Sequence, residues 1–267
     1  MNLNVTSDAE AIATAIDTFN PVYHRDYFSV RAAASDYLSN NPSIASVNLL
    51  ACSLIEALEG WGAGKRSAPT CRREPAVCQL LSDVSLRGKL KRLAASLDGM
   101  SLDDGERSIK TGGVFQNVED FDICLIDTLN ELADGLLVGN TNVTYPMKAL
   151  LLITGLMPAF DSQVRAGLHV AGFSGFAWRG RVRTQYLMPA HNRADAKRVC
   201  ALPFYIADCL SRSRQLLEDA IAISKFPALK DQVGRLFDIL FFMQGSVVSS
   251  KPLVSFSARH KKLWYAI

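Results

Sequence analysis

The chain has 267 residues, of which 49% are hydrophobic and 21% are charged, and its formal net charge is +3. This length allows one large domain or two small ones with a buried core, and the composition excludes an intrinsically disordered chain. The mildly basic balance permits a nucleic-acid partner, but it indicates one only if the positive charge gathers on one face.

The sequence predicts neither membrane insertion nor secretion. No apolar run reaches the length of about 18 residues that a transmembrane helix needs. The N-terminal stretch MNLNVTSDAEAI lacks the basic start and the apolar stretch of a secretory signal. We therefore expect a cytoplasmic protein with no membrane partner.

The six cysteines and four histidines form no recognisable metal site. No CxxC pair and no HExxH motif occurs, and Cys71 and Cys78 are six residues apart with no histidine nearby. The other cysteines lie in apolar helical patterns, where a thiol acts as a small hydrophobe; they are Cys52, Cys124, Cys200 and Cys209. We expect six reduced, structural cysteines and no metal. A nucleotide cofactor is not expected either, because glycine-rich phosphate loops are absent.

Helical periodicity dominates the first part of the chain. Ser7 and Glu10 form a capping-box pattern that begins a helix, and Pro21 is expected to end it. Further helices are predicted, and the five segments are about 7–19, 26–38, 43–58, 75–83 and 85–97. Between the third and fourth helices, residues 60–75 read as a basic, proline-containing loop.

The stretch 98–116 shows no regular pattern, and it predicts either a loop or the join between two lobes of a single domain, 1–267. Helices are again predicted after it, at about 117–134, from Pro146, from Asp161, and at about 192–201, 203–224 and 228–242. Residues 172–191 predict a hairpin or an extended loop, and the tail predicts a short strand or a docked arm. The fold class is therefore all-α, with about ten helices in one or two lobes.

One segment carries a chemical signature. Residues 147–165 read MKALLLITGLMPAFDSQVR. They place a lysine on one helix, then a proline, then an aspartate that begins a second helix; the matching residues are Lys148, Pro158, Asp161, Ser162, Val164 and Arg165. This pattern resembles the catalytic segment of the helix-hairpin-helix DNA glycosylase superfamily.

The resemblance implies a role for two of these residues. Lys148 would be the amine nucleophile, and Asp161 would stabilise positive charge developing on the sugar or activate the nucleophile. A carboxylate at a helix N-terminus is stabilised as an anion by the helix dipole and can face a cationic transition state. In the other interpretation, Asp161 is only the N-cap of its helix.

A basic segment, AWRGRVRTQY, follows at residues 177–186. Three arginines alternate along it, so they would point to one side of an extended chain and could contact phosphates. The flanking aromatic side chains could stack on bases. The predicted nucleic-acid contacts are Arg165, Trp178, Arg179, Arg181, Arg183 and Tyr186. The alternative is an ordinary solvated loop.

The sequence thus predicts a nucleic-acid-associated helical protein with a glycosylase-like scaffold, and leaves open whether it is an enzyme. The alternative is a non-enzymatic helical interaction or assembly protein. The expected partner is DNA or RNA in the first case and another protein in the second. No cofactor is expected, and the oligomeric state is not determined by the sequence.

Overall fold

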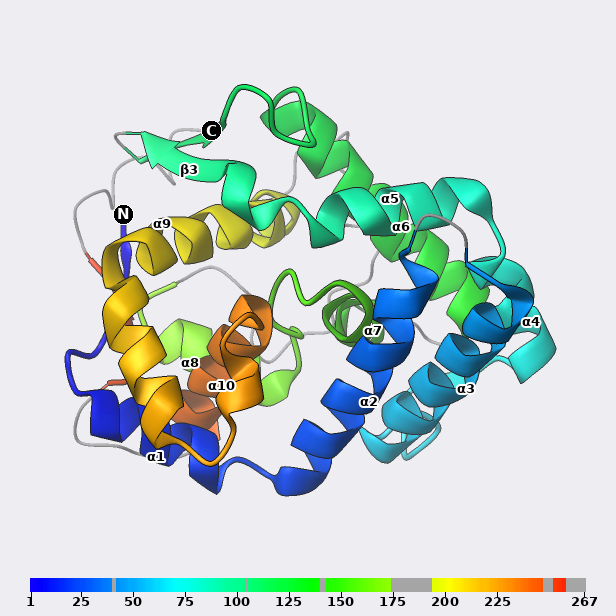
Figure 1. Ribbon diagram of the computed structural model, residues 1–267, viewed down its shortest axis with the longest axis horizontal. Coiled ribbons are helices and arrows are strands. Elements are labelled where there is room, and N and C mark those ends of the chain that lie inside the picture. The colour runs from blue at the N-terminus through cyan, green and yellow to red at the C-terminus, as the bar shows by residue number, and fades with distance from the viewer. Residues whose placement is uncertain (40–41, 104, 140–142, 174–193, 247–251, 258–267) are drawn as a thin grey trace.

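The computed structural model describes residues 1–39, 42–103, 105–139, 143–173, 194–246 and 252–257. Ten α-helices lie within these ranges, together with short strands in small sheets (Figure 1). The predicted all-α fold class is confirmed. Within the described ranges, no helix is both long enough and apolar enough to cross a membrane.

The first three helices are α1 (Ala9–Thr18), α2 (Pro21–Tyr37) and α3 (Ile44–Gly60). The prediction that Ser7 caps the first helix is wrong, because the Asp8 carboxylate accepts the Ala11 N–H at 3.0 Å. Pro21 does not merely end α1 but begins α2, about five residues earlier than predicted. Proline suits a first helical position, where its missing N–H has no partner to lose.

Helices α4 (Glu74–Leu81), α5 (Val84–Ala94) and α6 (Val118–Leu136) follow closely the predicted positions. The stretch between α5 and α6, expected to be without regular structure, contains a hairpin of β3 (Met100–Asp103) and β4 (Glu106–Ile109). Gly105 lies in its turn with a φ of 88°, a conformation that glycine adopts without steric cost.

The C-terminal helices are α7 (Thr144–Thr154), α8 (Ser162–Val170), α9 (Ala194–Ile223) and α10 (Val233–Ser246). The predicted break at Pro203 is wrong, because α9 continues through this proline and departs from helical geometry only at Ser213. Buried residues on both sides of Pro203 hold the helix together by packing, which offsets the lost backbone hydrogen bond. A short 3-10 turn, Pro227–Leu229, occupies the predicted start of the last helix.

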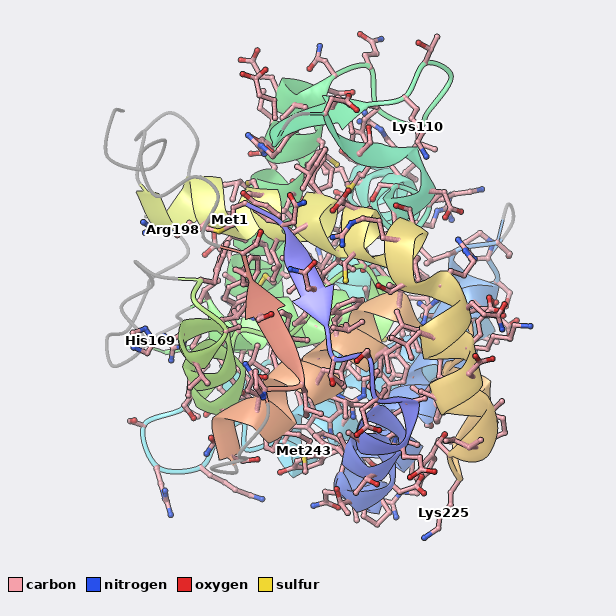
Figure 2. All side chains as sticks on the ribbon, turned by 90° about the vertical axis from the view of Figure 1, so that its left-hand side faces the viewer. Met1, Lys110, His169, Arg198, Lys225 and Met243 are labelled. Atoms are coloured by element: carbon pink, nitrogen blue, oxygen red, sulfur yellow. The ribbon has the colours of Figure 1, made fainter. Side chains whose placement is uncertain are left out.

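The two ends of the described chain meet in a sheet. The strand β1 (Leu3–Val5) pairs antiparallel with β6 (Val254–Phe256), and Figure 2 shows them side by side. The expected strand in the tail is therefore confirmed, whereas β1 was not predicted. A second small ladder joins β2 (Thr70–Cys71) to β5 (Leu137–Val138).

Helix α7 lies near the middle of the molecule and packs against α2, α3, α5 and α6 (Figure 1). Every residue from Tyr145 to Thr154 is buried, as expected of a helix that is apolar all round. Helices α8 and α10 approach each other very closely, because a side chain at Gly167 would place its Cβ 1.8 Å from the Phe241 carbonyl oxygen. Both ends of the predicted catalytic segment are thus held by the core.

Candidate functional site

Asp161 is positioned by the connection between α7 and α8. Helix α7 ends at Gly155, which adopts a left-handed conformation with a φ of 68°. Asp161 then caps α8, because its Oδ1 accepts the N–H groups of Gln163 at 3.0 Å and Val164 at 2.9 Å. Within the described residues, the Asp161 Oδ2 has no hydrogen bond. Asp161 is therefore a helix cap that uses only Oδ1 for capping.

Lys148 is buried, with a relative exposure of only 7%. Its Nζ donates to the carbonyl oxygen of Trp61 at 2.8 Å and lies 4.8 Å from the centre of the Tyr145 ring. Burial lowers the pKa of the Lys148 amine, and the negative charges of Asp161 and Asp238 oppose that change. Among the described residues, Lys148 forms no ion pair with a carboxylate.

Lys148 and Asp161 line the same cavity, which has a volume of about 50 Å³. The cavity lies among the ends of α1 and α3, the starts of α2 and α8, and the inner faces of α7 and α10. Its walls combine aromatic rings with charged groups: Phe19, Tyr23, Trp61, Lys148, Ala159, Asp161, Arg235, Asp238 and Phe242. The two residues that the sequence predicted as catalytic are thus neighbours in space.

Two cavity residues on α10 were missed by the sequence analysis. The Nη1 of Arg235 lies 2.6 Å from Oδ2 of Asp238, and both side chains are almost completely buried. The Oδ1 of Asp238 accepts the N–H of Ala159 at 2.9 Å, in the connection that leads to Asp161. Arg235 also donates to the Tyr23 carbonyl at 2.9 Å, and its Nε has no acceptor among the described residues.

The charges of the cavity influence one another. Burial raises the pKa of the Asp238 carboxyl to about 6, while Arg235 opposes this rise and Asp161 adds to it. The cavity therefore holds a buried amine, an anionic helix cap, a second carboxyl and a guanidinium. A weakened hold on the lysine proton favours the neutral amine, which is the nucleophilic form.

Of the predicted nucleic-acid contacts, only Arg165 lies within the described residues, and it does not line this cavity. Arg165 lies on α8 with an exposure of 8%, and its Nε donates to the Asp161 carbonyl oxygen at 3.3 Å. Burial lowers the pKa of its guanidinium. The remaining predicted contacts lie outside the described residues: Trp178, Arg179, Arg181, Arg183 and Tyr186.

A signal for the missed residues exists in the sequence. Arg235 and Asp238 stand three apart within VGRLFDILFF, so a helix places both on one face of an otherwise apolar segment. Trp61 lies in the glycine-rich EGWGAG, directly after a helix. Charges inside an apolar helix are usually paired or functional.

The described residues contain no cluster of histidine, cysteine or carboxylate side chains suited to a metal ion. The six cysteines are free thiols, and burial raises the pKa of Cys71, Cys124 and Cys209 to about 11. Comparisons with protein-family models, with curated proteins and with solved structures found no match.

Proposed function

We propose that this protein is a base-excising enzyme acting on DNA or RNA, with Lys148 as the nucleophile and Asp161 as the residue that stabilises positive charge on the sugar. The supporting observation is that these two side chains, from separate helices, line one cavity beside aromatic rings. Their order along the chain also resembles the catalytic segment of helix-hairpin-helix DNA glycosylases.

The amine suits nucleophilic chemistry. A buried lysine with a lowered pKa carries a larger neutral fraction at neutral pH than an exposed one. In the proposed reaction, Lys148 Nζ forms a bond to C1′ of the sugar as the glycosidic C–N bond breaks. The bonding electron pair leaves with the base, which takes up a proton, and the amine gives up a proton.

Asp161 supplies a negative charge at a fixed position. Its capping bonds use Oδ1 and hold the carboxylate at the start of α8. A preorganised charge of this kind costs no reorganisation when the sugar becomes cationic. The capping role and the catalytic role are thus compatible in one side chain.

The aromatic walls suit a flat substrate. Phe19, Tyr23, Trp61 and Phe242 present ring surfaces of the kind on which an extruded base stacks. The cavity volume of about 50 Å³ is well below the roughly 300 Å³ of the smaller pockets that hold ligands of drug size. A base therefore enters only when side chains move, and the half-buried rings of Tyr23 and Phe242 are placed to do so.

The test is an assay of base release and strand cleavage on duplexes and single strands that carry oxidised, alkylated or deaminated bases or an abasic site. Lys148→Gln is expected to abolish release through the covalent route. Lys225→Gln is the matched control, because Lys225 is exposed, projects from the surface (Figure 2) and does not line the cavity. This variant should keep the wild-type rate.

Two outcomes would overturn the proposal. If the wild type acts on none of these substrates, the protein is not a base-excising enzyme, and the alternative of a helical interaction protein remains. If the wild type is active and Lys148→Gln keeps its full rate, then Lys148 is not the nucleophile.

A further inference from the structure

The acceptor that holds Lys148 belongs to a well-defined helix end. Helix α3 ends in a Schellman motif, in which Gly62 donates to the Glu59 carbonyl at 3.0 Å and Ala63 donates to the Leu58 carbonyl at 2.8 Å. Gly62 has a φ of 102°, which favours glycine. The carbonyl of Trp61, the residue before Gly62, lies outside both of these bonds and receives the Lys148 amine instead.

This carbonyl is an unusual partner for a buried lysine. It accepts a hydrogen bond from the neutral amine as well as from the ammonium ion, so it fixes the position of Nζ without demanding the charged form. A carboxylate partner would favour the charged ammonium form. Asp161 and Asp238 act on Lys148 only through the electrostatic attraction of their charges, which raises its pKa. The rings of Tyr145 and Trp61 also face the amine, and Arg235 lines the same cavity.

The side chain of Trp61 is itself held in place. Its Nε1 donates to Oδ2 of Asp26, on α2, at 3.2 Å. The indole ring lies 5.5 Å from the ring of Tyr23 and 5.2 Å from the guanidinium carbon of Arg235. Asp26 also approaches the backbone at Gly60, where an added Cβ would lie 3.5 Å from its Oδ2. Asp26 thus connects α2 to the end of α3 that carries the Lys148 acceptor.

We propose that Asp26 is a positioning residue, which clamps Trp61 and thereby fixes where the Lys148 amine rests in the cavity. This inference depends on the proposed function for its biological meaning, because the amine needs a fixed position only if it reacts. Its physical content does not depend on any substrate.

The experiment measures the reactivity of Lys148 without nucleic acid. The folded protein is treated with formaldehyde and cyanoborohydride across a pH series. The amine condenses with the aldehyde to an imine with loss of water, and hydride from cyanoborohydride reduces the imine to the N-methyl amine. Mass spectrometry of the Lys148 peptide gives the labelling rate at each pH.

Asp26→Ala and Trp61→Phe both remove the hydrogen bond between the Trp61 indole and the Asp26 carboxylate. The loosened amine should become more accessible, so the high-pH plateau of its labelling rate should rise about fivefold, the equivalent of one hydrogen bond. The pH of half-maximal labelling should also move up toward that of an ordinary lysine. Asp26→Asn keeps an acceptor oxygen and should restore both values.

Asp36→Ala is the matched control, because Asp36 is exposed on the same helix and its side chain has no hydrogen bond among the described residues. The inference is overturned if folded Asp26→Ala and Trp61→Phe keep the wild-type midpoint and plateau, or if Asp36→Ala shifts them equally. Should Asp26→Ala fail to fold, the difference between Trp61→Phe and Asp26→Asn decides the question. Failure of the nucleic-acid assay in the wild type would count against the proposed function and leave this result intact.

Discussion

Two regions of the molecule hold a positively charged side chain in opposite ways. At the hairpin, Arg107 of β4 donates to both carboxylate oxygens of Asp122 on α6, at 2.6 and 2.9 Å, and lies over the ring of Phe204. In the cavity, Lys148 is bound only to the Trp61 carbonyl, among the described residues. Arg107 thus has a carboxylate partner, whereas Lys148 has none among the described residues.

This difference separates a structural site from a candidate reactive one. A bidentate arginine–carboxylate pair satisfies both charges and fixes the packing of two elements. Keeping a buried amine charged without a carboxylate partner costs free energy. Such an amine does not stabilise the fold, and its neutral form can react.

The largest expected effect is on the reaction. Asp161→Asn keeps the shape and most of the capping ability of the side chain, because asparagine caps helices about as well as aspartate. It removes the negative charge, so base release should fall by about two orders of magnitude or more, as for the loss of one transition-state contact. The free energy of unfolding should fall by well under about 1 kcal/mol. A full rate in this variant would show that Asp161 is a cap alone.

The second effect is on stability, and it contrasts the two cations directly. Asp122→Ala leaves Arg107 without its partner and should lower the free energy of unfolding by about 2 kcal/mol. Lys148→Met replaces a buried amine, which has no carboxylate partner among the described residues, by an apolar side chain of similar length. The change in the free energy of unfolding should stay within about 1 kcal/mol in either direction. Urea denaturation of both variants measures this, and equal losses would remove the distinction between the two regions.

Burial also opposes the positive charge of His24, so the pH dependence of stability tests the same reasoning. Burial lowers the pKa of His24 to about 4, and its ring stacks on Phe226 at 3.8 Å. Since the unfolded value is about 6.5, stability should be lost as the pH falls from about 6.5 toward 4, by at most about 1.4 kcal/mol per pH unit.

In that experiment, His24→Leu should flatten the dependence of unfolding free energy on pH. A slope that survives in His24→Leu would show that other groups cause the acid sensitivity.

The smallest effect concerns the predicted phosphate contacts, which lie outside the described residues. Replacing Arg179, Arg181 and Arg183 together by alanine should weaken binding to generic DNA or RNA. Each lost contact should flatten the plot of log affinity against log salt by up to about 0.9 on duplex DNA. Unchanged affinity and slope would indicate an ordinary solvated loop.

Much of the helical fold could be predicted from the sequence, because amphipathic periodicity and capping residues are local signals. Asp161 was recognised at the start of its helix and caps it. The hairpin at β3 and β4 was missed although its turn contains Asp-Gly, since its strands carry no clear alternation. Pro203 was misjudged because tertiary packing overrides a local helix breaker.

Only part of the candidate site could be predicted from the sequence. The resemblance in one short segment selected Lys148 and Asp161, which are close along the chain. Arg235, Asp238 and Trp61 reach the cavity from distant parts of the chain, and no local pattern relates them to Lys148. Their contribution depends on how α3, α7 and α10 pack, which a single sequence does not contain.

The most direct test of the central claim is to trap the covalent intermediate and locate it. The protein is incubated with a duplex that carries an abasic site, borohydride is added to reduce any imine, and the modified peptide is sequenced by mass spectrometry. We expect a cross-link on Lys148 that is lost in Lys148→Gln. A cross-link on an exposed lysine such as Lys225, or none at all with an otherwise active protein, would contradict it.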